Sequence, residues 1–417
     1  MNTSASNNQH STLNTRHSSL LRGDKIIWSV YFLFIIISIV EVFSAMGKEV
    51  VNNNFLPLLL RHTIFLLIGF ICCYIFHRTD YRKITRWLTF LLYLSIALTC
   101  VPYLMAALNS ETLSTARWIR LHLPFLNLQF QPSEIAKYAV LLYICSVMAA
   151  NQERIETKEI FFKALFPLLL VCMTVFWSNF STTVLIFVTG FLIMRIGGIN
   201  KRYLYLTLLI LVGLLGMLLL IAKLNPEFAS KIGRLATIVS RTEGHTSADY
   251  SEITQANQAL TAVATGGLLG RGIGNSIQSR FLEEGHNDFI FSIILEEGGI
   301  WLGGLIIFLY VILLYRMFKA ARNIDGYFGS MACLAIGILI TLQTLINMSV
   351  AVGLIPVTGQ TLPFISYGGT SFIFASIFLG MIINITISSE QSSISKEKIK
   401  PPTVSEEQQE IEINDNE

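Results

Sequence analysis

The residue best suited to chemistry is Asp288, which stands where a long polar insert meets an apolar stretch. The insert covers residues 223–287, and the apolar stretch begins at Phe289. An ionised carboxylate between water and hydrocarbon is costly when it is unpaired, so a functional site is the first hypothesis. A lone carboxylate is suited to act as a general base toward a hydroxyl group. The alternative is a helix N-cap, a position in which Asp is also common.

A second group of polar residues lies around the run QPSEIAK at 131–137, which Arg117 and Trp118 precede. Glu134 and Lys137 are three residues apart, so on a helix they share one face and can form an ion pair. The pair could take part in the chemistry. Alternatively, the two charges only neutralise each other and orient the helix, because buried ion pairs need no catalytic role.

A glycine-rich run at 266–274 follows a segment, 255–265, that has the pattern of a short amphipathic helix. The backbone N–H groups of such a run could approach a phosphate closely, with Arg271 as the counter-charge. The spacing also fits an ordinary tight turn. The run lacks the terminal Lys-Ser/Thr of a nucleotide-binding loop, so an ATP site is not expected.

The segment at 353–371 carries two prolines, four glycines and several hydroxyl side chains between two apolar runs. Irregular backbone at membrane depth must face protein or water, so this composition predicts a rigid turn that lines a polar cavity. Ser366 and Tyr367 are its candidate binding residues. His286, two residues before Asp288, is either a proton partner of that acid or an ordinary loop residue.

The elements that must position these residues are membrane-spanning helices. The chain is 53% hydrophobic and 14% charged, which is typical of a polytopic membrane protein. Its long apolar runs predict ten spans, at roughly 26–46, 56–76, 87–108, 132–150, 161–177, 180–196, 203–222, 289–315, 328–350 and 364–387. We therefore expect an all-α integral membrane protein with ten transmembrane helices. No patch typical of nucleic-acid binding occurs, and the six cysteines lie in apolar segments, where we expect packing rather than disulfides or metal binding.

The Lys and Arg residues predict the orientation. The two tails and four connections carry 19 of the 30 basic residues. These connections are 77–87, 151–163, 195–202 and 316–322. By the positive-inside rule both termini are cytoplasmic, and the large loop 223–287 between spans seven and eight is external. We thus expect a polar cytoplasmic tail at 1–25, a membrane domain at 26–387 and an acidic, disordered cytoplasmic tail at 388–417.

Four runs together resemble the signature blocks of the SEDS family, the shape, elongation, division and sporulation proteins typified by FtsW and RodA. The runs are QPSEIAK at 131–137, GGLLGRGIGNS at 266–276, HNDFIFSIILEEGG at 286–299 and GLIPVTGQTLPFISYGGTS at 353–371. The resemblance implies a ten-span peptidoglycan glycosyltransferase that polymerises lipid II at the outer face of the bacterial cytoplasmic membrane. It also implies a complex with a class B penicillin-binding protein, the transpeptidase that cross-links the new strand.

By this resemblance, Asp288 matches the family's essential acid. The family's other functional polar positions match Arg117, Trp118, Glu134 and Lys137. Two departures are present. Residues 178–183 read SNFSTT where many members carry an acidic Pro-Asp-x-Gly-Thr turn, so the role of that acid cannot be transferred. Asn287 stands where Thr is usual and keeps the capacity for hydrogen bonding.

Transfer from lipid II requires a sugar hydroxyl to attack an anomeric carbon and expel a lipid-linked pyrophosphate. Pyrophosphate leaves without a proton, so one base and cationic stabilisation suffice, and we expect Asp288 to be the base. The candidate pyrophosphate ligands are Arg117, Lys137 and Arg271, which a divalent cation such as Mg²⁺ could assist. The other expected substrate-binding residues are Trp118, Glu134, His286, Ser366 and Tyr367.

A lipid II flippase is the rival function, because a polar cavity and intramembrane charges would also serve transport. A flippase should carry charged groups along both leaflets, whereas the polar motifs here gather on the external side. Within the family, the two polar tails favour an FtsW-like role at the division septum, with other divisome membrane proteins as partners. A RodA-like elongation polymerase is the alternative.

Overall fold

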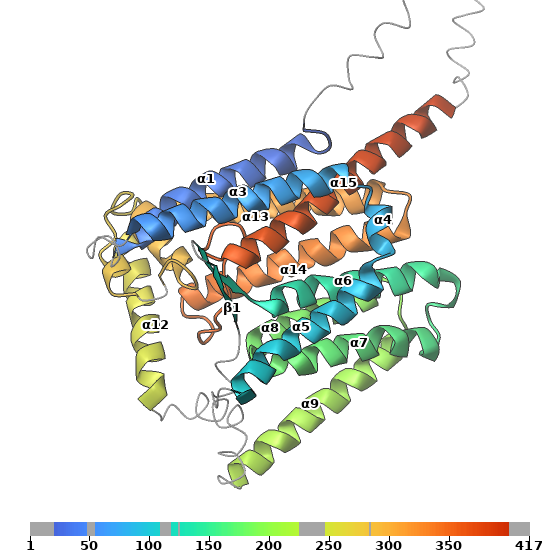
Figure 1. The fold of residues 1–417 in the computed structure, drawn as a ribbon, viewed down its shortest axis with the longest axis horizontal. Helices are drawn as coiled ribbons and strands as arrows, with labels where there is room; N and C mark the ends of the chain where they lie inside the picture. The colour runs from blue at the N-terminus through green and yellow to red at the C-terminus, as the bar shows by residue number, and fades with distance from the viewer. Residues whose placement is uncertain are drawn as a thin grey trace, which may run out of the picture.

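The computed structural model describes residues 21–47, 55–108, 118–123, 126–224, 247–282 and 285–399. Its α-helices are α1 (Lys25–Ala45), α3 (Phe55–Arg78), α4 (Tyr81–Thr85), α5 (Leu88–Leu108), α6 (Pro132–Ala150), α7 (Lys158–Phe176), α8 (Phe180–Ile196), α9 (Lys201–Leu224), α12 (Ser247–Gly266), α13 (Ile290–Asn323), α14 (Tyr327–Ala351) and α15 (Gly369–Ile399). Two 3₁₀ turns, η2 (Gln152–Arg154) and η3 (Gln278–Arg280), complete the helical elements. The start of α1 and the end of α15 lie at the same end of the bundle (Figure 1).

Each of the ten ranges expected to span the membrane overlaps one of these helices. Among the described residues, eight helices are long and apolar enough to cross a membrane, and α8 is a shorter apolar helix of 17 residues. The expected class, an all-α membrane protein, is confirmed in this coarse form. The count of ten spans, the side of the termini and the external loop stay predictions.

The helices pack in neighbouring pairs, with α3 along α15 and α13 against both α1 and α14. Aromatic rings fill the core where α1 and α13 meet the irregular segment before α15. Phe34 lies 4.6 Å from Tyr310 and 5.9 Å from Phe364, measured between ring centroids. These contacts bury the irregular segment among helices, as its depth in the bundle requires.

A short antiparallel hairpin, which was not predicted from the sequence, precedes α6. Strand β1 (Ile119–Leu123) pairs with β2 (Leu126–Phe130), and Ile119 lies opposite Phe130. The ring of Phe130 packs edge-on against Phe374 of α15, with 6.0 Å between centroids. The base of the hairpin is thereby attached to the bundle.

The described part of the insert is folded against helix ends. Helix α12 extends the predicted amphipathic helix and stands at the end of the bundle away from the last turns of α15 (Figure 1). A separate apolar cluster joins it to α1, α13 and α14. This cluster consists of Ala45, Ala259, Leu282, Phe289, Ile293 and Val350.

Helix α13 is interrupted at Gly299, whose φ is 62° and ψ is −164°. The glycine-rich turn docks into this interruption through backbone hydrogen bonds. Arg271 N donates to Glu296 O at 2.9 Å, and Gly272 N donates to Glu297 O at 2.8 Å. Ile300 N in turn donates to Gly267 O at 3.1 Å. The break therefore leaves these backbone groups satisfied, which a helix inside a membrane protein requires.

The buried carboxylates of Glu296 and Glu297 hold the stretch of chain that follows the turn. Glu297 accepts hydrogen bonds from Gly274 N at 3.1 Å and Ser276 N at 3.2 Å, and from the Ser44 hydroxyl of α1. Glu296 accepts from Ile277 N at 3.1 Å and Gln278 N at 3.2 Å. Gly274 N, within the turn, and three N–H groups just after it thus bind the protein's own acids, so the prediction that the turn offers its amides to phosphate is wrong at Gly274.

We predict that Gly270→Ala destabilises the protein far more than Gly267→Ala. Both glycines have positive φ, so each alanine carries a backbone cost of about 1 kcal/mol. A Cβ at Gly270 would lie 2.1 Å from Glu297 O, whereas nothing lies within 4 Å of a Cβ at Gly267. We expect an additional loss of at least about 2 kcal/mol for Gly270→Ala. Thermal unfolding in detergent, together with limited proteolysis of the turn, measures the stability of both variants. Equal losses of stability would contradict the packing of the turn against α13.

Candidate functional site

A cavity of about 420 Å³ opens between the starts of α3, α6, α8 and α15 and the segment before α13. Its wall is mostly polar side chains and backbone. The lining includes Arg61, Trp118, Gln129, Glu134, Asn179, Gln255, Asn287, Asp288, residues 357–361 and residues 367–371. The polar cavity predicted beside 353–371 is therefore present.

Asp288 lies on the wall of this cavity and is partly exposed. Helix α13 begins at Ile290, and Phe289 occupies its N-cap position. Asp288 is thus not the N-cap residue, so that interpretation of the acid is wrong. What remains is a carboxylate at the junction of a turn and a buried helix, facing a cavity large enough for part of a substrate.

Asn347 of α14 fixes the backbone of Asp288. It is fully buried, and its Nδ2 donates to Asp288 O at 2.8 Å and to Gln360 O at 2.7 Å. One side-chain amide therefore joins two irregular segments on different walls. This residue was missed from the sequence, although Asn347 and Gln343 stand four apart in an otherwise apolar helix, a spacing that places two amides on one face.

The expected pair is formed, with Lys137 Nζ 2.8 Å from Glu134 Oε2. Glu134 lines the cavity, whereas Lys137 lies behind it with 1% of its surface exposed. Lys137 Nζ also donates to Gln343 Oε1 at 3.0 Å, and Gln343 Nε2 donates to Thr361 O at 3.0 Å. The ammonium group is thus held by α6 and α14 together. The geometry is compatible with both roles considered for the pair.

Ser366, Tyr367 and His286 connect the two irregular segments. The Ser366 hydroxyl donates to Asn287 O at 2.7 Å, and Tyr367 N donates to His286 O at 2.9 Å. The Tyr367 ring lines the cavity and packs against the rings of His286 and His62, with centroids 5.2 Å and 5.4 Å away. Of these three predicted binding residues, only Tyr367 is among the lining residues, and the other two support the wall.

The remaining predicted residues are placed differently. Trp118, just before β1, lines the cavity and is 41% exposed. Arg117 falls outside the described residues. Arg271 lies in the docked glycine-rich turn and is not among the lining residues. Among the described lining residues the cation is Arg61, in the second turn of α3; it was not selected from the sequence, where a single basic residue near a span end is also a common membrane anchor.

The charged side chains among the described lining residues are Arg61, Glu134 and Asp288. Within the described parts of the chain, no group of three or more His, Cys, Asp or Glu side chains could hold a metal ion. The turn at 178–183, which lacks the family's acid, still contributes Asn179 and Thr182 to the wall. Thr182 Oγ1 accepts from Gln360 Nε2 at 2.8 Å, so this turn is tied to the same network.

Comparison with known proteins agrees with these features. Residues 24–391 match the family of cell cycle proteins FtsW, RodA and SpoVE. The chain is 31% identical over 343 residues to the probable peptidoglycan glycosyltransferase FtsW of Coxiella burnetii, covering 79% of this chain and 87% of that protein. It is 28% identical over 371 residues to the same-named protein of Geobacter sp. strain M18, covering 87% and 96%.

Solved structures share the fold. A chain from a structure on the coordination of polymerization and crosslinking by a peptidoglycan synthase complex superposes with a TM-score of 0.68 at 22% identity, over 89% of this chain and 99% of that one. The rod shape determining protein RodA of Thermus thermophilus gives 0.61 at 22% identity, over 88% and 97%. The family match, over residues 24–391, includes all four motif blocks. The chain belongs to the FtsW, RodA and SpoVE family of cell cycle proteins, the SEDS family that its motifs resemble.

Proposed function

We propose that this chain is a peptidoglycan glycosyltransferase that polymerises lipid II into glycan strands. The observation that carries the proposal is a carboxylate, Asp288, whose backbone is fixed by Asn347 on the wall of a polar cavity. Arg61 supplies a cation on the same wall. Relatives named as glycosyltransferases over most of the chain support the reaction type.

In the proposed reaction, a hydroxyl oxygen of the acceptor sugar bonds to the anomeric carbon of the donor, and the bond from that carbon to the lipid pyrophosphate breaks. Asp288 accepts the hydroxyl proton, and pyrophosphate leaves as an anion that needs none. Arg61, Lys137 and the predicted ligands Arg117 and Arg271 are the candidate cations for this anion. Trp118 and Tyr367 offer aromatic surface to the sugars.

We assign the cavity to the outer face of the cytoplasmic membrane, in a ten-span topology with both termini cytoplasmic. The excess of Lys and Arg on the opposite connections supports this orientation. The relatives named FtsW support a role at the division septum. A class B penicillin-binding protein is the proposed partner, since a solved chain of this fold comes from a synthase complex that couples polymerization to crosslinking.

We expect Asp288→Asn to abolish polymerisation while the protein remains folded, because the amide cannot accept the hydroxyl proton. Loss of a general base typically lowers the rate by ~10²–10⁴. The assay is glycan formation from lipid II by the purified protein with its partner. Asp80→Asn is the matched control, because Asp80 is exposed and caps α4 through Arg82 N at 2.9 Å. Normal polymerisation by Asp288→Asn, or a wild-type protein that translocates lipid II in liposomes without making polymer, would refute the proposal.

The two interpretations of the Glu134–Lys137 pair predict different results for a double substitution. Lys137→Met alone leaves a buried carboxylate unpaired and should destabilise the protein by about 3–5 kcal/mol. Adding Glu134→Gln removes that charge and should restore much of the stability. If the ammonium group serves catalysis, the double variant stays inactive at normal stability. Recovery of both stability and glycan synthesis would mean that the pair only neutralises itself.

Asn347→Leu should slow glycan synthesis by roughly 10-fold to 100-fold, because a near-isosteric side chain without N–H groups no longer fixes Asp288. Unfolding temperature and partner binding are measured in parallel. Thr341→Val is the control on the same helix, since the Thr341 hydroxyl bonds only within α14, to Gly337 O at 2.8 Å, among the described residues. An Asn347→Leu protein with wild-type activity would show that this amide does not position the acid.

A further inference from the structure

A second cleft, of about 290 Å³, lies at the opposite end of the bundle, where α1 begins and α3 ends. Its lining residues are Arg22, His77, Arg78, Asn384 and Ile387. Three of these five side chains are basic. The cleft is separate from the cavity that holds Asp288: the two share no lining residue, and they lie at opposite ends of α3.

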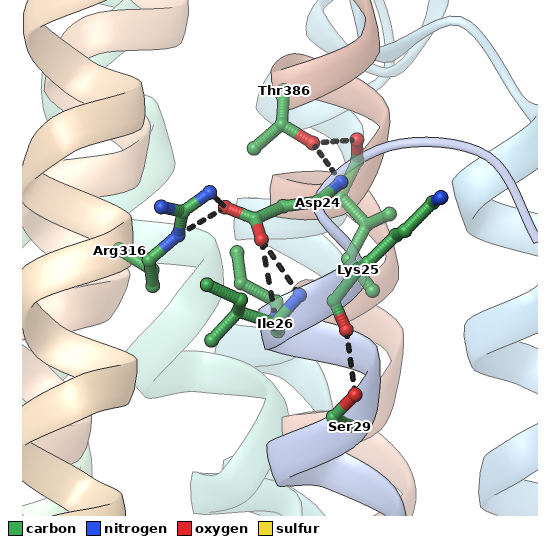
Figure 2. Close-up of polar contacts among 8 residues, drawn as sticks. Asp24, Lys25, Ile26, Ser29, Arg316 and Thr386 are labelled. Carbon is green, nitrogen blue, oxygen red and sulfur yellow. Dashed lines mark hydrogen bonds and ion pairs between the residues drawn. The ribbon is translucent and has the colours of Figure 1, made fainter.

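The backbone that carries Arg22 is held rigidly against two other helices. Gly23 has a φ of 87°, and a Cβ there would lie 2.9 Å from Ile383 O of α15. Figure 2 shows Asp24 joining three helices. Its carboxylate accepts from Arg316 Nε at 2.5 Å and from Ile26 N at 2.9 Å, and its N–H donates to Thr386 Oγ1 at 3.1 Å. The Asp24 charge is thereby neutralised by Arg316.

The other basic residues are also held in place. His77 is buried, and its Nδ1 lies 2.6 Å from Tyr74 O, so this nitrogen carries a hydrogen. The other ring nitrogen, Nε2, is buried with no hydrogen-bond partner among the described residues. The guanidinium of Arg78 lies over the Tyr74 ring at 4.9 Å, and Asn384 Nδ2 donates to His77 O at 2.8 Å.

We propose that this cleft binds the phosphate group of an anionic phospholipid. The guanidinium groups of Arg22 and Arg78 supply N–H donors that match the acceptor oxygens of a phosphodiester. Basic pockets between transmembrane helices are typical sites for such head groups. Close in sequence to the cleft residues, Ile26 of α1 and Ile75 of α3 are exposed apolar side chains of the kind that an acyl chain covers. The assignment of the cleft to the cytoplasmic leaflet rests on the orientation proposed above, but the binding itself does not.

The test uses the full-length protein in detergent and native mass spectrometry. We expect the wild-type protein to retain phosphatidylglycerol in preference to phosphatidylcholine with the same acyl chains, and inorganic phosphate to compete with it. No preference between the two lipids would overturn the proposal without any variant being needed. Stabilisation by inorganic phosphate with no retention of phosphatidylglycerol would overturn the lipid as the ligand and leave a free phosphate site.

Variants locate the site. Arg22→Gln with Arg78→Gln should lower phosphatidylglycerol binding roughly tenfold. Arg82→Gln is the charge-matched control, because Arg82 is an exposed residue of α4 outside the cleft. An equal loss in the control, or no loss in the double variant, would contradict the proposal. Glycan synthesis in phosphatidylcholine alone should be unchanged by the double variant. A loss of lipid binding can therefore be told apart from a loss of the proposed glycosyltransferase activity.

Discussion

The double hydrogen bond from Asn347 holds the functional end of the molecule together. Residues 285–289 and 360–368 are irregular, yet they are buried or half-buried among helices, where unpaired backbone groups are costly. Asn347 satisfies one carbonyl in each segment, and the Ser366 hydroxyl and Tyr367 N–H satisfy two more. The same bonds that meet this requirement also set the position of Asp288. Structural stability and the placement of the acid therefore depend on the same polar groups.

A similar solution operates at the break in α13. The regular backbone hydrogen bonds of the helix are interrupted at Gly299. Backbone groups of the glycine-rich turn form hydrogen bonds with the helix backbone there instead. Glu296 and Glu297, acids that are costly to bury alone, are satisfied by backbone N–H groups of the chain that follows the turn. Because Ser44 also bonds to Glu297, the insert is joined to the end of α1. The insert is thus part of the bundle's polar framework at the end that carries the cavity.

The helices were predictable because each apolar run is long and bounded by polar residues, so composition alone determines them. Asp288 and the Glu134–Lys137 pair were predictable because charges next to or within apolar runs are rare and therefore conspicuous. Asn347 and Arg61 were not predictable as site residues. A buried amide, or a basic residue near the start of a helix, has many possible roles that only tertiary contacts distinguish. His286 and Ser366 were predicted to bind substrate, but neither is among the lining residues; His286 O accepts from Tyr367 N, and the Ser366 hydroxyl donates to Asn287 O. The glycine-rich turn was recognised, but Arg271 N and Gly272 N bond to backbone carbonyls of α13, and Gly274 N bonds to the Glu297 carboxylate.

The central proposal is that Asp288 is the base for the acceptor hydroxyl. A structure of the Asp288→Asn protein with two lipid II molecules bound measures this most directly. We expect the acceptor hydroxyl within ~3.2 Å of the amide side chain introduced at position 288, with the donor pyrophosphate toward the basic residues. A pyrophosphate seated against position 288, with the acceptor hydroxyl elsewhere, would contradict the role of Asp288 as a general base.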